Sequence, residues 1–120
     1  MKKSVFVTGA TSGTGYAIAE RFAKEGYDVF IGSRNAESSQ AAADKLAQQY
    51  GVFAKGYQTI VFDENNVKEI FADIRANGYL LDCIVFNAAN LGLGQVSLEV
   101  DMQEFMNVFT GTERYINVRR

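Results

Sequence analysis

A glycine-rich segment near the N-terminus carries the residue types best suited to holding a phosphate group. Residues 8–15 read Thr-Gly-Ala-Thr-Ser-Gly-Thr-Gly, between an apolar run and an amphipathic segment. Glycines at a strand-to-helix turn let the backbone approach a pyrophosphate, and the first helical turn supplies unpaired N–H groups and a partial positive charge. The hydroxyls of Thr11, Ser12 and Thr14 add further donors. The segment therefore predicts a dinucleotide-binding loop.

The spacing of these glycines leaves a simpler alternative open. The pattern is G-x-x-x-G-x-G, which misses the G-x-G-x-x-G fingerprint by one residue, and it lacks the Gly-Lys-Ser/Thr of a P-loop. Three glycines between a strand and a helix can serve the turn alone. The nucleotide interpretation is favoured because the loop opens the first strand–helix unit and further motifs follow at suitable distances.

The end of the second apolar run indicates which cofactor fits. Residues 32–35 read Gly-Ser-Arg-Asn. Proteins that select NAD place Asp or Glu here to bind the ribose 2′-hydroxyl, whereas a nearby Arg accommodates a 2′-phosphate. No acid is present, Arg34 offers a planar charged fork, and Ser33 and Asn35 add neutral donors. An isolated Arg usually lies on a solvated loop, but at this position the sequence favours NADP over NAD.

Helical and strand patterns alternate along the chain. Strands are predicted at 4–8, 28–33, within 52–62 with a core at 58–62, and at 82–87, and helices at 14–25, 36–50, from 67 to about 78, and at 101–109. This order predicts a three-layer α/β fold, a Rossmann-type parallel sheet with strand order 3-2-1-4. Ligands bind such sheets at the carboxyl ends of the strands, where both motifs lie.

Composition narrows the class of protein further. The 120 residues suffice for a single domain spanning 1–120, and the net charge of −2 gives no reason to expect nucleic acid or an anionic membrane surface as partner. No apolar run approaches the ~18 residues of a membrane span. The absence of histidine excludes Ser-His-Asp and Cys-His catalysis and histidine-ligated metal, so no metal site is expected. The single cysteine, Cys83, excludes an intrachain disulfide and suits a cytoplasmic location.

Two stretches, together with Asp63, resemble one enzyme family. The loop at 8–15 resembles the cofactor loop of the short-chain dehydrogenases/reductases, and residues 84–89, Ile-Val-Phe-Asn-Ala-Ala, are similar to their Asn-Asn-Ala-Gly motif. Phe86 and Ala89 replace the first Asn and the Gly of that motif. The likeness runs over 3–109. It implies the NADP-binding half of an oxidoreductase that acts on a carbonyl or alcohol substrate.

The resemblance also implies a set of cofactor-binding residues. Pyrophosphate and the adjoining ribose would lie against Gly9, Thr11, Ser12, Gly13, Thr14 and Gly15. Asp63, after the third strand, would face the adenine, while Asn87 and Ala88 would line the sheet end beside the ribose. Thr14 stands where the family usually has Ile, a departure that we expect the backbone-dominated loop to tolerate.

No catalytic residue is predicted within these 120 residues. The family uses a Ser after its fifth strand and a Tyr-x-x-x-Lys on the next helix, and no such motif occurs here. Residues 115–119 read Tyr-Ile-Asn-Val-Arg and imitate it, but we expect them to form the outer part of the last helix. The chain alone is therefore expected to be inactive.

Two alternative functions stay open. The chain could be a small NADP-binding or redox-sensing module that works through a partner chain, or a flavodoxin-like module without nucleotide, against which the glycine loop argues.

The C-terminal residues and the sheet edge complete the expectations. The family's helix Asn would fall near Thr112, with Asn117 as a competing match, so 110–120 is predicted to be an atypical tail, as after a frameshift, an early stop or a cloning boundary. With order 3-2-1-4, the unprotected strand 82–87 would lie at the edge of the sheet. We therefore expect a homo-oligomer, most simply a dimer, that buries this edge or the apolar helix face of Met102, Phe105, Met106 and Phe109.

Overall fold

Strands and helices alternate along the chain, and the computed structural model describes residues 3–11, 13–59, 64–87 and 115–118. The elements are β1 (Ser4–Thr8), α1 (Gly13–Lys24), β2 (Asp28–Ser33), α2 (Ala36–Tyr50), β3 (Ala54–Gln58), α3 (Glu64–Ala76), β4 (Cys83–Asn87) and β5 (Tyr115–Val118). The predicted bounds of β1, β2 and α2 are confirmed. The predicted helix at 101–109 lies outside the described residues.

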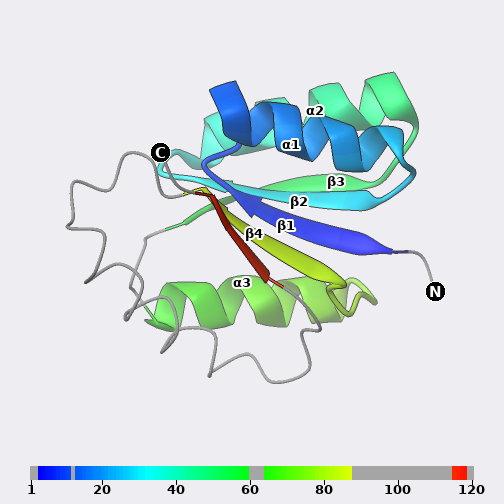
Figure 1. The fold of residues 1–120 in the computed structure, drawn as a ribbon. Coiled ribbons are helices and arrows are strands. Elements are labelled where there is room, and N and C mark those ends of the chain that lie inside the picture. The colour runs from blue at the N-terminus through cyan, green and yellow to red at the C-terminus, as the bar shows by residue number, and fades with distance from the viewer. Residues whose placement is uncertain (1–2, 12, 60–63, 88–114, 119–120) are drawn as a thin grey trace.

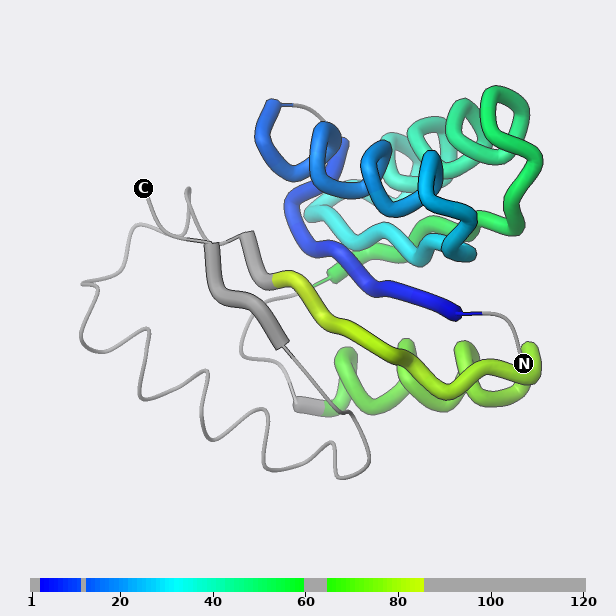
Figure 2. Tube along the Cα trace, turned by 45° about the vertical axis from the view of Figure 1, so that its right-hand side comes forward, coloured from blue at the N-terminus to red at the C-terminus, as the bar shows by residue number. Residues whose placement is uncertain are grey.

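All described strands form one parallel sheet in the order β3-β2-β1-β4-β5. Helices α1 and α2 cover one face of the sheet and α3 covers the other (Figure 1), and the turned view in Figure 2 shows the same three layers. The expected three-layer Rossmann-type architecture and the strand order 3-2-1-4 are confirmed. Among the described residues, no helix is long and apolar enough to cross a membrane.

Side chains of the central strands alternate between two cores. Val5 and Val7 of β1 join the cluster under α1 and α2, whereas Phe6 joins the cluster beside α3. Since every residue of β1 is buried, its middle needs apolar side chains on both faces, which explains the run Val5-Phe6-Val7.

Helix α2 has both ends fixed by its own flanking residues. The Asn35 side chain accepts a hydrogen bond from the Ser38 N–H at the N-terminal cap, 2.9 Å away. At the other end Gly51 adopts a left-handed conformation with φ of 68°, and its N–H donates to the carbonyl of Ala47. These caps account for the accurate prediction of this helix.

The third strand lies earlier in the chain than its sequence pattern predicts. The expected core at 58–62 is wrong, because β3 spans Ala54–Gln58. Since β3 lies at the edge of the sheet and is only partly buried, it needs no continuous apolar run. The apolar residues at 60–62, which drew the prediction toward the C-terminus, lie outside the described residues.

The last strand corrects a second expectation. Residues 115–118 do not end a helix; they form β5, which pairs in parallel with β4 through Ile84–Tyr115 and Val85–Ile116. A tyrosine and two β-branched residues among these four favour extended structure. Strand β4 consequently has a neighbour on each side and is an interior strand. Assembly through an exposed β4 edge therefore loses its basis.

Gly56 of β3 lies against the backbone of α2. A Cβ at this position would lie 2.3 Å from the Gln40 nitrogen and the Ser39 carbonyl carbon. The Gly56 N–H also donates to Gln40 Oε1 at 3.0 Å. The glycine therefore sets how closely α2 approaches the sheet.

We expect Gly56→Ala to lower the free energy of unfolding by about 1–3 kcal/mol, because backbone atoms must move to admit the methyl group. Urea denaturation measures the change. Ala41→Gln, which adds bulk at an exposed position of α2, is the control and should change stability by less than about 0.5 kcal/mol. Equal stability of Gly56→Ala and wild type would contradict the close approach of α2.

Candidate cofactor site

The loop after β1 follows a backbone path that requires glycine at two positions. Gly9 has a φ of 64° and Gly13 a φ of 60°, both in the left-handed region that residues with a Cβ rarely adopt. The Gly9 N–H donates to the carbonyl of Gly32 at 2.8 Å and ties the loop to the end of β2. The loop is therefore fixed at the carboxyl edge of the sheet.

Helix α1 begins at Gly13 and directs its first turn toward the same edge. No acidic residue occupies that first turn, so the partial positive charge of the helix N-terminus is not neutralised within it. Gly15 is buried, and the side chains of Thr11 and Thr14 are half-buried. Ser12 lies outside the described residues. The donor set that remains, backbone N–H groups and threonine hydroxyls, suits an anionic pyrophosphate.

The strand register brings the other expected residues to this edge. Thr8 pairs with Gly32, and Ser33 pairs with Gln58, so β1, β2 and β3 end side by side. Val7 pairs with Val85, which places the backbone of Asn87 at the same carboxyl edge of the sheet. Asp63 and Ala88 lie outside the described residues, and their roles stay predictions.

Ser33 and Asn35 build the turn that carries Arg34. The Ser33 hydroxyl donates to the Asn35 carbonyl at 2.9 Å and lies 2.6 Å from the Ser39 hydroxyl oxygen. Asn35 Oδ1 is occupied by the N-terminal cap of α2. Both side chains therefore have structural partners already, and their predicted contact with the cofactor remains untested.

Arg34 itself presents its side chain outward. The residue is exposed, and its guanidinium makes no hydrogen bond or ion pair with any other described residue. Its backbone carbonyl accepts a hydrogen bond from Gln58 Nε2 at 3.3 Å. The described structure thus holds the Arg34 backbone while leaving the charged fork available to an anion.

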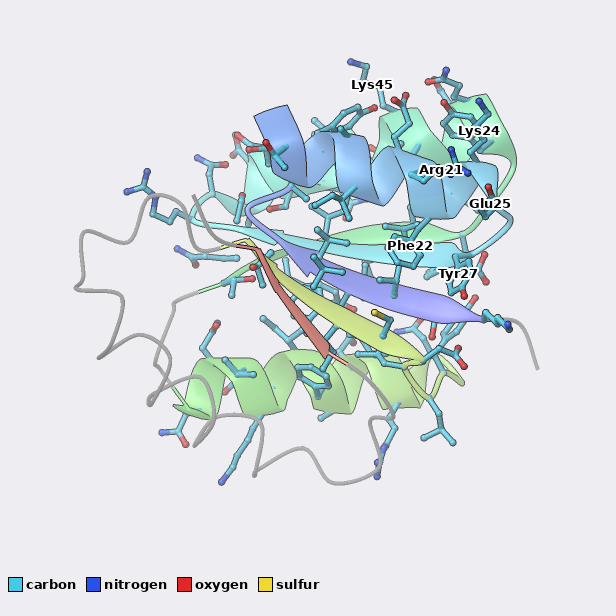
Figure 3. All side chains as sticks on the ribbon, in the orientation of Figure 1. Arg21, Phe22, Lys24, Glu25, Tyr27 and Lys45 are labelled. Atoms are coloured by element: carbon cyan, nitrogen blue, oxygen red, sulfur yellow. The ribbon has the colours of Figure 1, made fainter. Side chains whose placement is uncertain are left out.

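Two other basic side chains of this helical layer lie elsewhere. Arg21 and Lys24 belong to the last turn of α1, remote from the loop, where they complement the negative end of the helix dipole (Figure 3). Arg21 also pairs with Glu25 at 3.0 Å, one helical turn away. Among these three basic residues, Arg34 alone lies at the edge where the loop ends.

The packing at the end of β3 has no counterpart among the sequence predictions. Thr59 is only 6% exposed, and its hydroxyl oxygen has no hydrogen-bond partner among the described residues. A Cβ on Gly32 would lie 2.0 Å from that oxygen, so the Thr59 side chain occupies the space beside the glycine. The Thr59 N–H donates to the Ser33 carbonyl at 2.7 Å. A threonine near a strand end is too common to have indicated this packing.

A tyrosine and a lysine that meet elsewhere in the fold are unsuited to general acid catalysis. Tyr57 donates its hydroxyl proton to Asp73 Oδ2 at 2.7 Å, and Lys55 Nζ lies 2.7 Å from the same oxygen. Burial and the bond to Asp73 raise the pKa of the Tyr57 phenol well above its ordinary value. Such a phenol is a poor proton donor near neutral pH.

Ionisation of Tyr79 is expected to lower the stability of the fold at alkaline pH. Its hydroxyl donates to Asp28 Oδ2, a carboxylate only 2% exposed, whose other oxygen accepts from the Phe53 N–H at 2.9 Å. Burial, together with this bond and the charge of Asp28, raises the pKa of Tyr79 to about 12. Because the unfolded state loses this proton near pH 10, the contribution of Tyr79 is complete below pH 10 and is lost as the pH rises toward 12.

We therefore expect Tyr79→Phe to lower stability at pH 8 by about 1–3 kcal/mol and to flatten the decline of stability between about pH 10 and 12. Urea denaturation at a series of pH values checks both effects. Tyr27→Phe is the control, because Tyr27 precedes β2 at the same end of the sheet and packs edge-on against Phe22. An unchanged alkaline slope in Tyr79→Phe would contradict the assignment.

Comparison with known proteins agrees with this geometry. The short chain dehydrogenase family matches residues 3–112. Sorbose reductase SOU1 of Candida albicans is 40% identical over 86 residues, which are 72% of this chain and 30% of the relative. The 3beta-hydroxysteroid dehydrogenase of Mediterraneibacter gnavus is 38% identical over 109 residues, 89% of this chain and 38% of the relative.

Solved structures show the same likeness. L-sorbose reductase from Gluconobacter frateurii, complexed with NADPH and L-sorbose, superposes with a TM-score of 0.67 at 31% identity, over 78% of this chain and 35% of that one. The NADPH-dependent 3-quinuclidinone reductase from Rhodotorula rubra gives a TM-score of 0.67 at 34% identity, over 75% of this chain and 34% of that one.

The chain belongs to the short-chain dehydrogenase/reductase family of oxidoreductases. It spans about a third of the length of the curated relatives it matches, with shares of 30%, 35% and 38% among them. The family resemblance inferred from the glycine loop and the Asn87 segment is thereby confirmed.

Proposed function

We propose that this chain binds NADP(H) as the cofactor-binding portion of an oxidoreductase that acts on a carbonyl or alcohol. One observation carries the proposal: the glycine loop, the start of α1 and the available Arg34 side chain lie at the same edge of the sheet. The loop and helix start suit a pyrophosphate, and the guanidinium suits a 2′-phosphate. The similar L-sorbose reductase from Gluconobacter frateurii, solved with NADPH, supports this choice of cofactor.

In this proposal each part of the site has one task. The backbone N–H groups after Gly9 and at the start of α1 would bind the pyrophosphate, and Arg34 would bind the 2′-phosphate as a bidentate donor. A bound nicotinamide cofactor would supply or accept the hydride of the reaction. Asp63, Asn87 and Ala88 would line the adenine and ribose positions. Substrate specificity would come from residues beyond this set.

Isothermal calorimetry with NADP+, NAD+ and FMN tests the proposal. We expect binding of NADP+, weaker binding of NAD+ and none of FMN. Binding of FMN alone would contradict the assignment of NADP(H). Failure to bind any of the three would refute a nucleotide site at this edge and favour the flavodoxin-like alternative without nucleotide.

A second candidate function follows from the tyrosines of the chain. No tyrosine in the 120 residues is followed four positions later by lysine, so the acid of the family's reaction is missing from this sequence. An NADP-binding or redox-sensing module that works through a partner chain would need no such acid.

Homo-oligomer formation and a cytoplasmic location also remain part of the proposal. Light scattering at micromolar concentration tests whether the protein forms a homo-oligomer.

We expect the 120-residue protein to bind NADPH without oxidising it when a carbonyl substrate is added, because proton transfer requires a positioned acid of suitable pKa. Loss of NADPH absorbance over time provides the measurement, with an active family member as the positive control. Turnover that disappears in Tyr115→Phe would overturn this expectation and assign catalysis to Tyr115.

A further inference from the structure

Two successive residues at the end of β3 hold the backbone that carries Arg34. Gln58 donates from Nε2 to the Arg34 carbonyl at 3.3 Å, and the Thr59 N–H donates to the Ser33 carbonyl at 2.7 Å. The second bond continues the pairing of β2 with β3. The first reaches Arg34, one residue beyond the last paired position of β2, so the Gln58 side chain also fixes the start of the loop that follows β2.

Gln58 is itself anchored from the opposite side of the sheet. Asn66, in the first turn of α3, donates from Nδ2 to the Gln58 carbonyl at 3.0 Å. Helix α3 covers the face opposite α1 and α2 (Figure 1). A chain of hydrogen bonds therefore runs from α3 through β3 to the Arg34 carbonyl.

The other side of the same loop is fixed by its own residues. Ser33 and Asn35 bond to each other, and the Ser39 hydroxyl donates to the Asn35 carbonyl at 3.0 Å. The Arg34 backbone is thus held from α2 and from β3 while its side chain stays available. Because bidentate recognition by a guanidinium depends on the direction in which the side chain leaves the backbone, a fixed backbone favours it.

We propose that Gln58 is a positioning residue for recognition of the 2′-phosphate and acts through Arg34. The inference rests on the proposed function, since it assumes that the 2′-phosphate binds at Arg34. Gln58 needs no contact with the cofactor. Its amide fixes the Arg34 carbonyl, and removal of that bond lets the guanidinium leave the geometry that two parallel hydrogen bonds require.

Gln58→Leu tests the proposal, because it keeps a side chain of similar size and removes the donor. One neutral hydrogen bond corresponds to an expected loss in NADP+ affinity of about three- to tenfold, with NAD+ affinity unchanged. Calorimetry measures both affinities. The ³¹P resonance of the 2′-phosphate in bound 2′,5′-ADP should shift toward that of the free ligand. Gln48→Leu, at an exposed position of α2, is the matched control and should change neither.

A double-mutant cycle with Arg34→Ala decides whether Gln58 acts through the arginine. We expect Gln58→Leu to cause no further loss of NADP+ affinity once Arg34 is removed. Additive losses, or equal losses for NADP+ and NAD+ in Gln58→Leu, would overturn the inference and leave the proposed function standing. A wild-type protein that does not bind NADP+ would refute both.

Discussion

Gly13→Val is expected to weaken dinucleotide binding by at least about a hundredfold, since charge-assisted hydrogen bonds to the pyrophosphate are worth about 1.5–3 kcal/mol each. The valine side chain would occupy the space through which a phosphate approaches the loop backbone. The φ of 60° at Gly13 also disfavours a β-branched residue, so the local backbone path should change. Calorimetry with NADP+ measures the loss, and circular dichroism reports whether the fold is retained.

A matched control separates the effect of backbone strain from the effect of blocked cofactor binding. Gly78 follows α3 and has a φ of 91°, and a Cβ added there would meet no atom of the described residues within 4 Å. Gly78→Val therefore introduces similar backbone strain away from the site. We expect this variant to lose stability and to bind NADP+ with full affinity. A folded Gly13→Val protein that binds as tightly as wild type would exclude this loop as the site.

Arg34→Ala is expected to weaken NADP+ binding by about ten- to a hundredfold and to spare NAD+, because the lost contact is a hydrogen-bonded ion pair with the 2′-phosphate alone. The Arg34 side chain has no partner among the described residues, so the substitution should not disturb the fold. Affinities for both cofactors, measured by calorimetry at one salt concentration, provide the test.

Arg75→Ala is the control for the loss of positive charge. Arg75 is exposed in the last turn of α3, and its removal should leave the ratio of NADP+ to NAD+ affinity unchanged. Equal losses for both cofactors in Arg34→Ala would show that Arg34 does not distinguish them.

Local pattern was sufficient to predict the elements that are fully buried or well capped. The middle residues of β1 and β2 are apolar because both faces of these strands are covered, and α2 has a cap at each end. Pattern failed at the two outer strands. β3 is partly exposed, and β5, although its residue types favour extended structure, is only four residues long and is defined by its pairing with β4.

The candidate site also combines features that local sequence predicts with features that depend on contacts between distant residues. The glycine loop and Arg34 could be predicted because their positions follow from strand–helix order. The hydrogen bond from Gln58 to the Arg34 carbonyl could not be predicted, since it depends on the register of β3 against β2, across 24 residues of sequence. The partial occupation of Ser33 and Asn35 by the turn likewise depends on where the side chain of Ser39 lies.

The outer side of β3 has a consequence for colloidal behaviour. The Gly56 N–H is taken by the Gln40 side chain, and the Gln58 carbonyl is taken by Asn66. A foreign strand that docked along β3 would need these same two backbone groups to continue the ladder of hydrogen bonds. Side chains from α2 and α3 thus act as gatekeepers against amyloid-like growth from this edge, and removal of both amides would make β3 a template for aggregation.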